Sequence, residues 1–144
     1  GRIAESFLAN TILFDTHVLA AAMHRRLVAH NPGLDLYRRL LLGAEARRFP
    51  VQEVDAEIRV LQEALRALAA EGRVRLGEVV ASGTPQDLRA SGLHHFARYH
   101  SVRAMDQEDG TLILEDARLA LYYANRLEGY PLPEPLPPLP GGRR

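Results

Sequence analysis

The most regular hydrophobic pattern in the chain predicts a long amphipathic helix over residues 51–71. Charged and amide side chains fill the positions between the apolar ones. Pro50 suits the first turn of this helix, and Gly72 suits the left-handed position after its last turn. We therefore expect the other elements to pack on its apolar face. Its apolar residues recur at intervals of four, three, four and three positions: Val54, Ile58, Leu61, Leu65 and Leu68.

Shorter apolar patterns predict further helices on either side of this one. We expect a first helix over residues 2–14 and a second over residues 16–30, with side-chain oxygens at its start. Asp35 can cap a third, shorter helix whose apolar positions are Leu36, Tyr37, Leu40 and Leu41. A last helix follows Asp116 and ends near residue 129.

Short strands are predicted near residues 73–80, 101–105 and 111–114, and in the first of these apolar residues alternate with polar ones. Asp109-Gly110 is a favourable hairpin turn between the last two. The predicted fold class is therefore mainly α with a small antiparallel β-sheet (α+β). We expect a helical bundle around helix 51–71 with a winged-helix-like order of elements.

The last residues differ in composition from the rest of the chain. Residues 1–129 are predicted to form a single helical domain, because about this length can bury one core. Residues 130–144 are rich in Pro. This composition is typical of an extended polyproline II segment or a disordered tail.

Composition excludes several kinds of site. The 144 residues contain 18 acidic and 18 basic side chains, so no net charge attracts the chain to nucleic acid. The absence of Cys excludes disulfides, thiolate metal sites and Cys nucleophiles. No signal peptide is visible, and the longest apolar run, residues 12–23, is interrupted by polar side chains and is too short to span a bilayer.

His30 and Asp35 have the spacing of the His-x4-Asp catalytic pair of glycerolipid acyltransferases. In such a pair the His acts as general base on the acceptor hydroxyl, and the Asp orients the His. The alternative interpretation is structural, because Pro32 and Gly33 also make this segment a helix end followed by a helix cap.

Three diarginine pairs lie in the first fifty residues, where acidic side chains are few. They could form a basic face for phosphates, anionic lipid headgroups or a protein partner. The alternative is a solvated helix surface. The pairs are Arg25-Arg26, Arg38-Arg39 and Arg47-Arg48.

The histidines outside this segment lack a metal-binding spacing. His17 and His24 are seven residues apart on one predicted helix, and His94, His95 and His100 lie close together in the sequence. No accompanying carboxylate motif completes a zinc site, so we predict no metal. A P-loop and a dinucleotide fingerprint are also lacking, and we predict no cofactor.

Two segments of the chain carry a family resemblance. The first reads GRIAESFLANTILFDTHVLAAAMHRRL and the second reads DGTLILEDARLALYYANRL. Together they resemble the C-terminal helical region of the glycerol-3-phosphate acyltransferase family, in which the closing helix ends Leu-x-Tyr-Tyr-x-Asn-x-Leu. His17 stands where that family tends to have Pro. The matching residues are Arg2, Ile3, Phe7, Thr16, Val18, Leu19, Ala20, Ala22, Leu119, Leu121, Tyr122, Tyr123, Asn125, Arg126 and Leu127.

The resemblance implies a non-catalytic accessory domain of a glycerolipid acyltransferase, with a supporting or membrane-docking role in phospholipid biosynthesis. It places the catalytic motifs in the remainder of a larger polypeptide, and the start at Gly1 rather than Met also indicates a fragment. The expected location is cytoplasmic and peripheral to an anionic membrane. The alternative is a stand-alone winged-helix-like module for protein interaction or homodimerisation, since an acidic wing disfavours nucleic acid.

Overall fold

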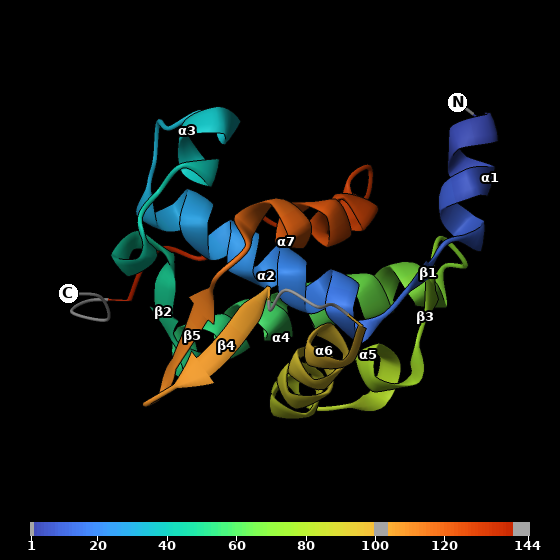
Figure 1. Cartoon of the computed structure of the whole chain (residues 1–144). Coiled ribbons are helices and arrows are strands. Elements are labelled where there is room, and N and C mark those ends of the chain that lie inside the picture. The colour runs from blue at the N-terminus through green and yellow to red at the C-terminus, as the bar shows by residue number, and fades with distance from the viewer. Residues whose placement is uncertain (1, 100–103, 140–144) are drawn as a thin grey trace.

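The computed structural model describes residues 2–99 and 104–139, and it confirms a mainly helical α+β fold (Figure 1). A short parallel pair of strands and a three-stranded antiparallel sheet accompany the helices. The elements are α1 (Arg2–Asn10), β1 (Ile12–Leu13), α2 (Asp15–His30), α3 (Leu36–Leu40), η1 (Ala44–Arg47), β2 (Arg48–Pro50), α4 (Val51–Ala70), β3 (Arg75–Leu76), α5 (Glu78–Ser82), α6 (Pro85–Tyr99), β4 (Met105–Glu108), β5 (Thr111–Leu114), α7 (Ala117–Ala124) and η2 (Asn125–Leu127).

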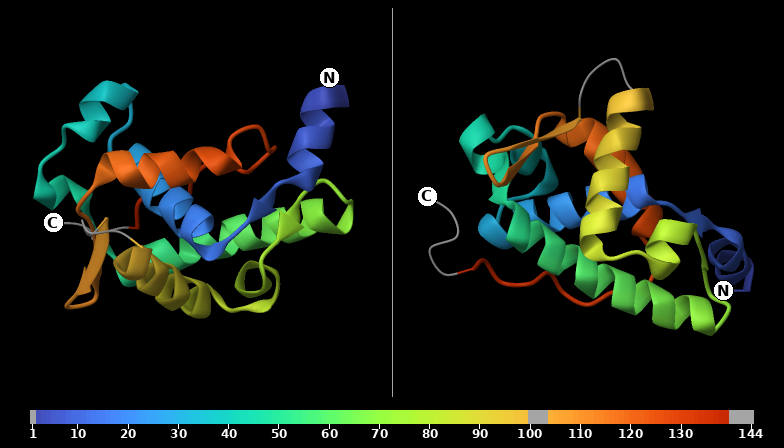
Figure 2. Two further views of the ribbon diagram at one scale, coloured as in Figure 1. Left: turned by 45° about the vertical axis from the view of Figure 1, so that its right-hand side comes forward. Right: turned by 90° about the horizontal axis from the view of Figure 1, so that it is seen from below.

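Helix α2 lies in the middle of the bundle and contacts α4, α6 and α7 (Figures 1 and 2). A helix covered on several sides must be apolar over most of its circumference. This holds for α2, in which Ala and larger apolar side chains are buried without a break from Val18 to Met23.

Helix α4 has the apolar face that the sequence predicts. Val54, Ile58, Leu61 and Leu65 are fully buried and Leu68 is almost so. The helix ends at Ala70, and Gly72 adopts the expected left-handed conformation with a φ of 74°.

The antiparallel sheet has the strand order β2-β5-β4. Its hairpin is confirmed, because Glu108 pairs with Thr111 and only Asp109 and Gly110 lie between them. Both turn residues have positive φ, 47° and 76°, as a two-residue turn that matches strand twist requires. Strand β4 begins at Met105, so most of the predicted strand 101–105 lies outside the described residues.

The remaining strands differ from the prediction. The segment 73–80 contributes only Arg75 and Leu76, and these pair in parallel with β1 rather than with the hairpin. The third strand of the antiparallel sheet is β2, which the sequence did not indicate because it has only three residues and ends in Pro50. Proline is tolerated there because β2 is an edge strand.

The first helix is shorter than expected. It ends at Asn10 rather than near residue 14, because Ile12 and Leu13 leave the helix to pair with β3. Helix α2 therefore starts at Asp15 and takes Phe14 as its N-terminal flanking residue.

Residues 130–139, which we call the C-terminal segment, contain no helix or strand. They run as an extended chain against the folded part rather than forming an element of their own. Tyr130 is buried and its hydroxyl donates to the carbonyl of Leu8. Figure 2 shows the segment running alongside α4.

Within the described residues, none of the helices combines the length and the apolar composition needed to cross a bilayer.

Gly92 sets the close approach of α6 to α2. A Cβ atom at this position would lie 2.8 Å from Cδ2 and 3.2 Å from Cβ of the fully buried Leu19. We predict that Gly92→Ala lowers the free energy of unfolding by about 1–3 kcal/mol, although Ala normally stabilises a helix relative to Gly. Urea denaturation measures the change.

Gly43→Ala is the matched control, since a Cβ atom there has no neighbour within 4 Å. Its effect should stay within about 0.5 kcal/mol. A Gly92→Ala variant as stable as the parent chain would show that the two helices do not approach this closely.

Candidate functional site

His30 and Asp35, the predicted catalytic pair, are not brought together. His30 Nε2 contacts Oε1 of Glu53 on α4. The Asp35 carboxylate instead accepts a hydrogen bond of 2.9 Å from the Arg38 backbone N–H and caps α3. A general base needs an orienting carboxylate within hydrogen-bond reach, so these two residues do not form a catalytic dyad. The helix-end and helix-cap interpretation is the one that the structure supports.

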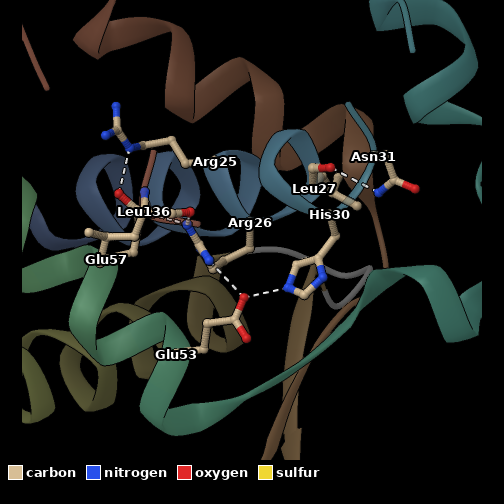
Figure 3. Close-up of polar contacts among 8 residues, drawn as sticks. All are labelled: Arg25, Arg26, Leu27, His30, Asn31, Glu53, Glu57 and Leu136. Atoms are coloured by element: carbon tan, nitrogen blue, oxygen red, sulfur yellow. Dashed lines mark hydrogen bonds and ion pairs between the residues drawn. The ribbon is translucent and has the colours of Figure 1, made fainter. Parts of the chain in front are cut away.

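His30 belongs to a buried charge cluster between α2 and α4, formed with Arg25, Arg26, Glu53 and Glu57 (Figure 3). The guanidinium of Arg26 is completely buried and donates to Oε1 of Glu53 at 2.7 Å and to Oε1 of Glu57. Residues four apart lie on one helix face. The pair 26 and 30 on α2 therefore meets the pair 53 and 57 on α4.

The C-terminal segment closes one side of this cluster. Arg26 donates to the carbonyl of Leu136 at 2.5 Å, and Glu57 Oε1 accepts from the Leu136 N–H at 3.1 Å. Arg25 donates to Oε2 of Glu57 at 2.8 Å and to the carbonyl of Pro133 at 2.5 Å. The two arginines thus bind two main-chain carbonyls of this extended segment, and the Glu57 carboxylate binds one of its N–H groups.

Two members of the predicted basic face are therefore engaged in the cluster. Arg26 is inaccessible, and the Arg25 side chain is only 14% exposed. The physical reason is that facing carboxylates on α4 offset the cost of burying these cations.

The other four arginines lie around α3 and β2. Arg47 donates to the carbonyls of Leu42, Leu114 and Glu115, and its role is to fasten the chain before β2 to the sheet. Arg39 is half-buried and donates to the carbonyl of Leu34, and Arg48 is half-buried on β2. Arg38 is the most exposed of the four, with 72% of its side chain accessible to solvent.

Helix α3 and the residue that follows it present a largely apolar surface to solvent. We call it the α3 surface, and its residues are Leu36, Tyr37, Arg38 and Leu41. Tyr37 is 68% and Leu41 60% exposed, and no residue of the helix is buried. Figure 1 shows α3 at the opposite end of the molecule from α1. The sequence identified these apolar positions but gave no sign that they remain uncovered, because a five-residue helix is too short to show a buried face.

Among the described residues, no group of three or more His, Cys, Asp or Glu side chains could hold an ion. His100 lies outside that part of the chain. Burial, together with the charge of Arg39, lowers the pKa of His24 to about 4. Its Nε2 atom is buried and has no hydrogen-bond partner in the described structure.

No protein-family model matches this chain, and comparisons with curated proteins and with solved structures found none that is significantly similar. The resemblance to the glycerol-3-phosphate acyltransferase family therefore stays a prediction.

The buried charge cluster should be sensitive to removal of its central cation. Arg26→Met leaves two buried carboxylates without their main partner, and we predict a loss of about 3–5 kcal/mol of unfolding free energy. Arg38→Met is the matched control, because its pair with Asp35 is exposed and 3.8 Å long. That change should cost less than about 1 kcal/mol. Equal effects in urea denaturation would contradict a stabilising role for the cluster.

His24 should make stability depend on pH. Its pKa is about 4 in the folded chain, below the usual 6.5, so the unfolded chain binds more protons between these values. The stabilisation is fully present above pH 6.5 and is lost as the pH falls towards 4, by up to about 3 kcal/mol.

The variant His24→Gln isolates this effect, since all other titrating groups are unchanged. We expect the unfolding free energy of the parent chain to fall more steeply than that of the variant between pH 6.5 and 4. Parallel pH profiles would show that His24 titrates normally.

Proposed function

We propose that this chain is a non-catalytic accessory domain that docks on anionic membranes through the α3 surface. The proposal includes the parent protein that the sequence resemblance implies, a glycerolipid acyltransferase of the glycerol-3-phosphate type, and a cytoplasmic, peripheral location. The observation that carries the docking role is the exposure of Leu36, Tyr37 and Leu41 beside Arg38.

This combination of side chains suits the boundary between headgroups and acyl chains. Leucine side chains gain free energy on leaving water, and tyrosine places its ring in the apolar layer and its hydroxyl among the headgroups. Residues 31–48 contain four Arg but only Asp35 and Glu45 as acids. An excess of positive charge attracts anionic lipid, so the charge favours a membrane over a neutral protein surface.

The docking proposal uses fewer arginines than the basic face expected from the sequence. Arg26 is buried in the cluster, Arg25 is partly buried there, and Arg47 is bound to three carbonyls, which leaves Arg38 as the principal headgroup contact. One short helix with few charges gives weak, reversible binding. Such a domain would assist the membrane attachment of a larger polypeptide rather than provide it alone.

The proposal assigns acyl transfer to another part of that polypeptide. His30 and Asp35 engage different partners, and His30 is nearly enclosed by the fold. An acceptor hydroxyl could not reach a general base in this position.

The second candidate is a winged-helix-like module for protein interaction or homodimerisation. It is favoured by the β4–β5 hairpin, which exposes Glu108 and Asp109 at its tip. Acidic side chains repel nucleic-acid phosphates, so a wing of this charge fits a protein partner better than DNA.

Cosedimentation with vesicles tests the docking role. We expect the whole chain to bind vesicles containing phosphatidylserine, to prefer them over phosphatidylcholine alone, and to lose part of this binding in high salt. Tyr37→Ser and Leu41→Ser should each lower the partition coefficient several-fold, and the double variant more, because each apolar contact contributes roughly 1–2 kcal/mol.

Phe7→Ser is the matched control, because Phe7 is 67% exposed and belongs to α1, the helix at the other end of the molecule from α3 (Figure 1). It should leave vesicle binding unchanged. Binding that does not respond to the two α3 substitutions would refute docking through this surface. A dimer that the α3 substitutions dissociate, without any vesicle binding, would support the interaction module instead.

A further inference from the structure

An open pocket of about 420 Å³ lies at the first turn of α2, away from the α3 surface. Ligand sites are typically concave, with apolar walls and a few convergent polar groups. This pocket combines both kinds of lining. Its walls include Phe14, Asp15 and His17 from the start of α2, His95 from α6, Tyr123 from α7 and Arg126 from the turn after it.

His17 offers a fixed hydrogen-bond donor to the pocket. The residue is only 9% exposed, and its Nδ1 accepts a hydrogen bond of 3.0 Å from the Phe14 backbone N–H. A neutral imidazole that accepts at Nδ1 carries its proton on Nε2. Within the described residues, Nε2 has no partner. The buried ring, which belongs to a residue that lines the pocket, therefore holds an unused N–H group.

The neutral form of His17 is also the favoured one. Burial lowers its pKa, and the positive charge of Arg126 lowers it further, against a smaller opposing effect of Asp15. The Phe14 amide thus sets the tautomer of His17, while burial and Arg126 favour its neutral form.

Both carboxylate oxygens of Asp15 already have hydrogen-bond partners. Its Oδ1 accepts from the Thr16 N–H at 2.7 Å, and its Oδ2 contacts Nδ1 of His95 at 2.6 Å and accepts from the Ser91 hydroxyl. Asp15 is consequently engaged on both oxygens. Among the groups that line the pocket, Nε2–H of His17 has no partner within the described residues, and the guanidinium of Arg126 has no ion pair there.

We propose that this pocket binds a small carboxylate with a flat apolar group, such as an aryl carboxylate. One guanidinium and one imidazole N–H match the two oxygens of a carboxylate, and the N-terminus of the 16-residue helix α2 favours an anion. The rings of Phe14 and Tyr123 flank His17, with centroid distances of 5.9 and 5.8 Å. They provide an apolar wall for the rest of the ligand.

A single uncompensated cation suits a monoanion better than a phosphate dianion, because Asp15 would repel the second charge. This distinguishes the proposal from a general phosphate site. It is also independent of the proposed membrane docking, since the two surfaces share no residue.

Titration of the whole chain with benzoate, followed by ¹H–¹⁵N NMR at about pH 7, tests the proposal. We expect saturable shifts of the Phe14 amide and of the His17 imidazole nitrogens, with benzoate binding more tightly than acetate or inorganic phosphate at equal ionic strength. Arg126→Gln should weaken benzoate binding about tenfold, because a charge-assisted hydrogen bond is lost.

Arg118→Gln is the matched control, since Arg118 is an exposed arginine on α7 that does not line the pocket. It should bind benzoate as the parent chain does. Absence of benzoate binding, or binding that Arg126→Gln leaves unchanged, would overturn the site. Phosphate binding more tightly than benzoate would overturn the assigned ligand class. Because Arg126 is exposed, the variant should keep the fold, which its NMR spectrum verifies directly.

Discussion

The buried guanidinium of Arg26 is the interaction on which the arrangement of this protein depends. An unpaired charge in a protein interior costs several kcal/mol, so α2 and α4 can pack only where Arg26 meets Glu53 and Glu57. Apolar side chains alone would tolerate a small slip of one helix along the other. The ion pairs remove that freedom and fix the register of the two longest helices.

That register places two different surfaces at the ends of α2. At its C-terminal end, the turn after His30 leads into α3, whose apolar residues stay in solvent. At its N-terminal end, Asp15 and His17 meet α6 and the residues that follow α7 around a pocket. Between these ends, residues 18–23 of α2 are buried in the core and present no side chain to solvent. The proposed docking surface and the proposed ligand pocket can therefore change independently of each other and of the packing between them.

Elements whose signal is local could be predicted from the sequence. The buried face of α4 follows from a helical period, and the β4–β5 hairpin follows from Asp109-Gly110. The partners of His30 and Arg26 could not be predicted, since they depend on how two separate helices align. Strand β2 has three residues and no alternation to detect. The pocket combines residues from opposite ends of the chain, and spacing in the sequence carries no information about such a site.

The C-terminal segment has a consequence for the order in which the molecule assembles. Leu136 contacts Arg26 and Glu57 across separations of 110 and 79 residues. On a ribosome, the first helices emerge long before their partner at residue 136 has been translated, and chains fold as their segments become available. Until then the cluster is open to water on one side. The charge cluster therefore closes only after residue 136 has been synthesised. Before that point, α2 and α4 should be packed less tightly than in the folded domain.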